Sequence, residues 1–97
     1  MSFALLTHPL FQKHRTHDHP ERPERLKAID EVLENGDFGC ELTPFEARPA
    51  TDEELLRCHE QQVLDLVAAL TGSGGGHIDP DTYVNPHSEA AARLAVG

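Results

Sequence analysis

The stretch His19-Pro20-Glu21-Arg22-Pro23-Glu24-Arg25-Leu26 decides how the first half of this sequence folds. Pro23 suits the first turn of a helix, where its missing N–H group is not needed. Glu21 and Glu24 place negative charge near the N-terminus of that helix, where the helix dipole favours it. We therefore predict a helix that begins at Pro23 and ends at Asn35. Its apolar face comprises Leu26, Ile29, Val32 and Leu33.

The segments on either side of this helix predict two strands. Residues 2–11 contain the apolar cluster Phe3-Ala4-Leu5-Leu6, which is typical of a buried strand. Residues 12–20 are polar and rich in histidine, which indicates a loop. Residues 41–47 predict a second strand, in which Pro44 favours an edge position. A strand–helix–strand unit favours a parallel pair. Two strands alone leave unpaired edges that invite another chain, so we expect a homo-oligomer.

The second half of the sequence predicts three more helices. Thr51 is a good N-cap, and Glu54 lies three residues further on, which completes a capping box. The strand-helix-strand-helix-helix-loop-helix order places the chain in the α/β class. The expected elements here are a helix from Thr51 to about Cys58, a helix from about Glu60 to the glycine-rich run 72–76, an irregular loop over 77–87, and an alanine-rich helix capped by Ser88 and ending at Gly97.

Three segments together resemble the histone deacetylase superfamily, the zinc amidohydrolases that include acetoin-utilisation proteins and acetylpolyamine amidohydrolases. They are His19 to Leu26, Pro44 to Leu55, and Asp79 to Val84 with the helix after it. The resemblance covers nearly the whole chain, in order and at the spacing of the family. It implies that residues 1–97 form a single truncated domain, the N-terminal part of the deacetylase (arginase-like) parallel-sheet fold.

The resemblance also implies where the chemistry of the family lies. Two aspartates and a histidine bind zinc in these enzymes and leave a position open for water and the acyl oxygen. In full-length relatives these residues follow the segment that this chain matches, so we expect no catalytic residue and no cofactor in the isolated chain. Tyr83 lies in the wrong segment to be the tyrosine that polarises the carbonyl group.

Two positions match residues of the family that lie near the substrate. Asp81 matches the aspartate at the rim of the active site that grips the backbone amide of the substrate. A loop aspartate in an Asx-turn is the alternative interpretation. Arg25 matches an arginine near the internal channel beneath the active site. The alternative for Arg25 is a helix-surface arginine paired with Glu21 or Glu24.

The loop histidines are weak candidates for a metal site. His14, His17 and His19 are close enough in sequence to reach one zinc ion, and some eukaryotic relatives hold a structural zinc near this loop. Those relatives also use cysteines, which this loop lacks. Ordinary loop histidines that bind no metal are the alternative interpretation.

Charge and composition exclude several functions. The formal net charge of −9 argues against nucleic-acid binding, which needs a basic face, and leaves room for a small cationic ligand. The alternative interpretation is that the charge only provides solubility. The two cysteines, Cys40 and Cys58, fit free thiols in a reducing cytoplasm. No apolar run approaches the roughly 20 residues that span a membrane.

These observations support two hypotheses. The first is a truncated deacetylase-like protein without the catalytic zinc machinery, acting as an oligomeric binding or interaction module of unknown ligand. The second is a zinc-dependent deacetylase of acetyl-lysine or acetylpolyamine substrates that needs a complementing polypeptide.

Overall fold

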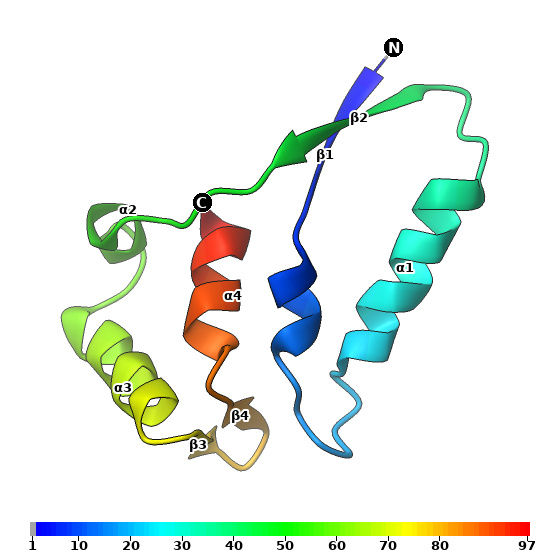
Figure 1. Ribbon diagram of the computed structural model, residues 1–97. Coiled ribbons are helices and arrows are strands. Elements are labelled where there is room, and N and C mark those ends of the chain that lie inside the picture. Colours follow the sequence, from blue (N-terminus) through cyan, green and yellow to red (C-terminus); the bar gives the residue numbers. More distant parts are fainter. Residues whose placement is uncertain (1) are drawn as a thin grey trace.

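The computed structural model describes residues 2–97 and shows an α/β arrangement that begins with a parallel strand pair (Figure 1). No helix in this part of the chain is long and apolar enough to cross a bilayer. The elements in order are β1 (Ser2–Thr7), the 3-10 helix η1 (Pro9–Lys13), α1 (Pro23–Asn35), β2 (Glu41–Glu46), α2 (Asp52–Leu56), α3 (Gln61–Gly72), β3 (Gly76–Asp79), β4 (Thr82–Val84) and α4 (Ser88–Val96).

The strands β1 and β2 pair in parallel, as the strand–helix–strand order predicts. Their register places Ser2 opposite Glu41, Leu5 opposite Pro44 and Thr7 opposite Glu46. Within the described residues this sheet has two strands, so each strand keeps one edge without a partner. The proline lies within β2, in keeping with an edge strand.

The first predicted strand is too long, because the chain turns after Thr7. Residues 9–13 form the 3-10 helix η1 instead of extending the strand. Pro9 occupies the first turn of this helix, where its missing N–H group is not needed as a hydrogen-bond donor. The N–H of Leu10 donates to Nδ1 of His8 at 3.0 Å, which caps the turn. The apolar pair Leu10-Phe11 therefore belongs to a helical turn.

The loop predicted over residues 77–87 is also partly wrong, because it contains the antiparallel hairpin of β3 and β4. These strands have four and three residues, and their register shifts between His77 and Asp79. The ring of Tyr83 lies edge-on to two imidazoles, with centroid distances of 4.8 Å to His17 and 5.0 Å to His77. These contacts fix a hairpin that has no strong pattern in the sequence.

Two helix predictions are confirmed by local hydrogen bonding. The helix α1 has the predicted bounds. At the start of α2, Thr51 and Glu54 form the predicted capping box. The carboxylate of Glu54 also accepts two hydrogen bonds from Arg48, at 2.7 and 2.8 Å. These bonds from Arg48, followed by that from the backbone of Thr51, lower the pKa of Glu54 to about 2.

The buried apolar core is small and surrounds α4. Arg93 on this helix forms an ion pair with Asp52 at 2.7 Å, and its backbone carbonyl accepts from the N–H of Ala50 at 2.8 Å. These contacts hold the segment before α2 against α4. Among the residues that the structure describes, the buried apolar ones are Ala47, Ala50, Val84, Ala91 and Leu94.

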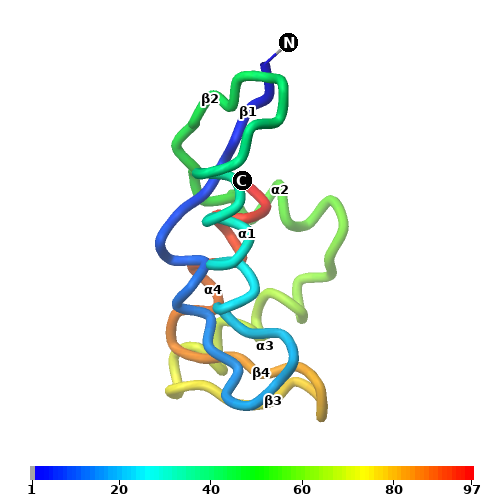
Figure 2. Tube along the Cα trace, turned by 90° about the vertical axis from the view of Figure 1, so that its right-hand side faces the viewer, coloured from blue at the N-terminus to red at the C-terminus, as the bar shows by residue number. Residues whose placement is uncertain are grey.

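The chain is more open than an independent domain of its size. Its accessible surface is 7021 Å², whereas about 5,500 Å² is expected for a compact protein of its 10.7 kDa. Its radius of gyration is 15.2 Å, against about 12.5 Å expected for a compact chain of this length. The extents of 44 × 33 × 17 Å describe a plate, which Figure 2 shows edge-on. Large apolar side chains therefore stay exposed on its faces.

Candidate substrate-rim site

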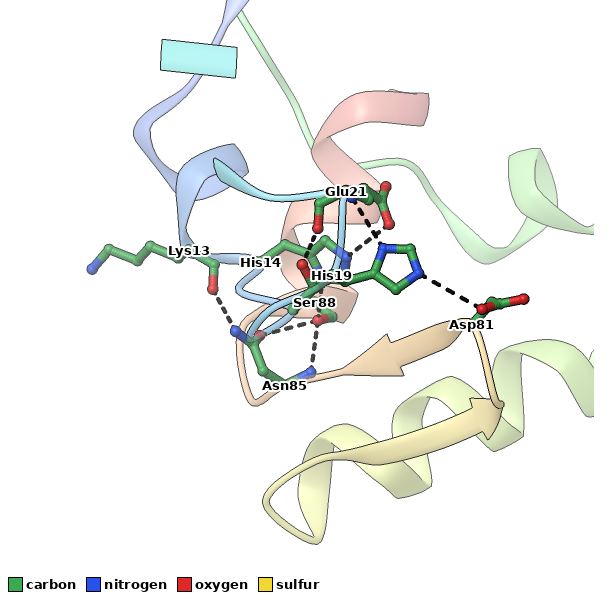
Figure 3. Close-up of polar contacts among 8 residues, drawn as sticks. Lys13, His14, His19, Glu21, Asp81, Asn85 and Ser88 are labelled. Atoms are coloured by element: carbon green, nitrogen blue, oxygen red, sulfur yellow. Dashed lines mark hydrogen bonds and ion pairs between the residues drawn. The ribbon is translucent and has the colours of Figure 1, made fainter. Parts of the chain in front are cut away.

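Asp81 lies at the tip of the β3–β4 hairpin, with its carboxylate directed toward solvent. Its side chain is 94% exposed, and Nε2 of His19 lies 3.9 Å from its Oδ1 (Figure 3). An Asx-turn does occur here, but the side chain of Asp79 forms it by accepting from the N–H of Asp81 at 2.9 Å. The carboxylate of Asp81 is thus free of backbone bonds and can accept a hydrogen bond from a ligand N–H group.

The three loop histidines do not converge on one point. Nδ1 of His14 lies 2.6 Å from Oγ of Ser88, the ring of His17 packs against Tyr83, and Nδ1 of His19 accepts from the N–H of Glu21 at 3.0 Å. His17 has a positive φ of 57°, which turns the backbone between the other two. Each imidazole therefore has its own protein partner.

The donor set of the described residues does not fit a zinc ion. Residues 2–97 contain no group of three or more His, Cys, Asp or Glu side chains arranged to hold a metal. A catalytic zinc site needs three protein ligands and one open position. The zinc that belongs to the chemistry of the family therefore has no ligand set in this part of the structure.

Arg25 lies on the first turn of α1 and lines an open groove between α1 and η1. The groove has a volume of about 250 Å³ and is also lined by Phe11, His14 and Glu21. The alternative interpretation paired Arg25 with Glu21 or Glu24, but the described residues show no such ion pair. Arg25 and Asp81 lie on different elements, Arg25 on α1 and Asp81 at the tip of the β3–β4 hairpin, and the histidine-rich loop precedes both in sequence.

A buried polar cluster at the start of α4 joins the two halves of the chain. Asn85 and Ser88 are 8% and 6% exposed. The N–H of Asn85 donates to Oγ of Ser88 at 2.8 Å, and Nδ2 of Asn85 donates to the carbonyl oxygen of Lys13 at 2.6 Å. Together with His14 these residues form the Asn85–Ser88 cluster (Figure 3). It fixes the histidine-rich loop beside the hairpin that carries Asp81.

Sequence reasoning assigned Ser88 the wrong role and missed Asn85. Ser88 is the first residue of α4 and makes no N-cap bond to the helix; His87 occupies the N-cap position. The hydroxyl of Ser88 instead donates to Oδ1 of Asn85 at 3.0 Å. The signal for Asn85 was its position before proline and a helix start, where asparagine side chains bind nearby backbone groups.

We expect Ser88→Ala to lower the free energy of unfolding by about 1–3 kcal/mol, because it leaves the buried N–H of Asn85 without an acceptor. Urea unfolding at one fixed protein concentration measures the change. Ser73→Ala is the matched control, since its exposed hydroxyl donates only to the carbonyl of Leu70, and we expect a change within about 0.5 kcal/mol. Equal unfolding midpoints for Ser88→Ala and the unsubstituted chain would contradict the assignment.

The parallel strand pair, the helix that connects its strands and the hairpin with its exposed carboxylate define an α/β fold with a parallel sheet. The model of the histone deacetylase domain family matches residues 19–97. The chain therefore belongs to this family, and the predicted family is confirmed.

Similar proteins agree with this assignment. Histone deacetylase 15 of Arabidopsis thaliana is 37% identical over 94 residues, which cover 96% of this chain and 17% of that protein. The histone deacetylase-like amidohydrolase of Pseudomonas aeruginosa is 35% identical over 79 residues, covering 81% of this chain and 21% of that protein. The crystal structure of the HDA15 HD domain superposes with a TM-score of 0.85 at 32% identity, covering 96% of this chain and 29% of that one. This chain thus spans less than a third of each of these relatives.

Proposed function

We propose that this chain is a deacetylase-like interaction module that works as a homo-oligomer and does not hydrolyse amides by itself. The observation that carries the proposal is the exposure of apolar side chains on both faces of the β1–β2 pair. Phe3 and Leu6 lie on opposite faces of β1 and are 54% and 53% exposed. Phe45 on β2 is 54% exposed. Parallel sheets occur with both faces covered, so this pair needs another surface against it.

The helix that connects the strands supports the same proposal. Two residues of the predicted apolar face of α1, Ile29 and Val32, are 53% and 60% exposed. Burial of an apolar side chain stabilises by about 25 cal/mol per Å². A partner that covers these side chains and the sheet gains this free energy. The large accessible surface and the open plate shape also support a partner that covers these side chains.

The hairpin end supplies the binding role. The carboxylate of Asp81 is exposed, and the chain carries a net charge of −9, so a small cation or an amine with N–H donors is the ligand class that fits. We also propose that the chain acts in the cytoplasm, because both Cys40 and Cys58 are free thiols.

A second candidate function is a zinc-dependent deacetylase of acetyl-lysine or acetylpolyamine substrates, completed by another polypeptide. The superposition on the HDA15 HD domain favours it, because this chain covers only 29% of that domain. The remaining part of such a domain would cover the same exposed strands and helix. It would also have to provide the metal ligands.

Three measurements on the purified 97-residue chain test the proposal: its mass in solution by sedimentation equilibrium, its zinc content, and its turnover of an acetyl-lysine reporter. We expect a dimer or larger species at micromolar concentrations, no stoichiometric zinc and no turnover above the buffer rate. A stable monomer would refute the homo-oligomer. Chelator-sensitive turnover with one zinc ion per chain would refute the non-catalytic module.

A further inference from the structure

We infer that a second copy of this chain joins through the free edge of β1, so that two copies form one four-stranded sheet in the order β2-β1-β1-β2. This inference rests on the proposed homo-oligomer and specifies its contact. The two copies are related by a twofold axis perpendicular to the sheet, which makes the two β1 strands antiparallel. Both copies then contribute the same surface to the contact.

The free edge of β1 is accessible. Among residues 2–97, β1 pairs with β2 alone, so its other edge presents unpaired N–H and C=O groups over Ser2–Thr7. The strand pair extends beyond the helices at the N-terminal end of the molecule in both views (Figures 1 and 2). An exposed edge of this length is a template for a strand of another chain.

Charge selects β1 over β2 as the contact. The sequence of β1 is Ser-Phe-Ala-Leu-Leu-Thr and has no charged residue, whereas β2 begins with Glu41 and ends with Glu46. An antiparallel contact between two copies of β2 would bring these carboxylates together, in a chain that already carries a net charge of −9. Pro44 would also remove one hydrogen-bond donor from that strand. Two copies of such an acidic chain repel each other least when they associate through an uncharged strand.

The side chains of β1 suit such a contact on both faces of the sheet. A twofold axis perpendicular to the sheet keeps each side chain on its own face. Phe3 and Leu5 of one copy therefore join Phe3 and Leu5 of the other on one face, while Ala4 and Leu6 do so on the opposite face. Cross-strand pairs of apolar side chains stabilise antiparallel strands. The contact extends two small apolar surfaces into two larger ones.

A pair of charge substitutions at one level of the sheet tests the inference. Ala4 and Thr43 are register partners in β1 and β2. We expect Ala4→Glu to weaken self-association about tenfold or more, because each copy would place a carboxylate in the contact. Thr43→Glu adds the same charge on the neighbouring strand, outside the contact, and we expect less than about a threefold change. Sedimentation over a concentration series measures both dissociation constants.

A disulfide trap provides a test that does not depend on a destabilising charge. In the proposed dimer, the twofold axis places one residue near the middle of β1 directly opposite the same residue of the other copy. The cysteine variants are made in a Cys40→Ser, Cys58→Ser background. Either Ala4→Cys or Leu5→Cys should then form a disulfide-linked dimer on mild oxidation. Thr43→Cys should not form one.

The outcomes separate the inference from the proposed function. A monomeric unsubstituted chain would refute the homo-oligomer itself. An oligomer that Ala4→Glu and Thr43→Glu weaken equally, with no dimer trapped at position 4 or 5, would refute only the β1 contact. An oligomer that is weakened by Thr43→Glu and trapped by Thr43→Cys would place the contact on β2.

Discussion

Gly75→Ala is expected to lower the free energy of unfolding by about 3 kcal/mol or more, because the new methyl group has neither a suitable backbone conformation nor free space. Gly75 has a φ of +111°, which residues with a side chain rarely adopt. A Cβ atom at this position would lie 2.5 Å from the carbonyl oxygen of Val84 and 3.2 Å from Cα of Asn85. Both are backbone atoms, so neither can move aside by changing a rotamer.

A substitution at the neighbouring Gly74 separates the two causes of this loss, which are the backbone conformation and the lack of space for a Cβ atom. Gly74 has a φ of +96°, but a Cβ atom there meets nothing within 4 Å. Gly74→Ala should therefore cost only the backbone strain, about 1–2 kcal/mol. Thermal and urea unfolding of both variants at equal protein concentration measure the difference. Equal losses for the two variants would mean that the contact with β4 relaxes without cost.

Gly75→Ala is also expected to affect the candidate site at the hairpin tip. Gly75 connects the end of α3 to the hairpin, and its N–H donates to the carbonyl oxygen of Leu70 at 2.7 Å. A shift of Gly75 moves β4 and the Asn85–Ser88 cluster that follows it. We therefore expect Gly75→Ala to change the environment of Asp81 at the hairpin tip as well as the stability.

Leu94→Ala is expected to lower the free energy of unfolding by about 2–5 kcal/mol. Leu94 is 9% exposed and, among residues 2–97, it is with Val84 one of two buried apolar residues larger than alanine. Its removal takes a large share of the core from a chain whose total stability is of the order of 5–15 kcal/mol. Little can refill the cavity, because the neighbouring buried residues are mostly alanines.

Leu56→Ala is the matched control for this substitution. Leu56 lies at the end of α2 and is 41% exposed, so we expect a loss within about 1 kcal/mol. Urea unfolding at one protein concentration compares the two variants, because the proposed self-association would make apparent stability depend on concentration. Similar losses at both positions would contradict the assignment of Leu94 to the core around α4.

The contacts of the histidine-rich loop could not be predicted from the sequence. Spacing alone allowed His14, His17 and His19 to share one metal ion. The structure gives them partners as distant in sequence as Ser88, to which Nδ1 of His14 lies 2.6 Å away. Such contacts depend on how α4 packs against η1, and no local pattern encodes that packing.

The sequence by itself determined the helix from Pro23 to Asn35 and the capping box at Thr51, because each follows from bonds and periodicity within a few residues. It also determined the parallel strand pair, because a strand–helix–strand order favours parallel pairing. It also determined the family, through motifs spread along the chain. Only the tertiary structure decided the β3–β4 hairpin, the cluster around Asn85 and the direction of each loop imidazole. Short strands and buried polar side chains are stabilised by partners far away in the chain, so their conformation is decided only when those partners come together.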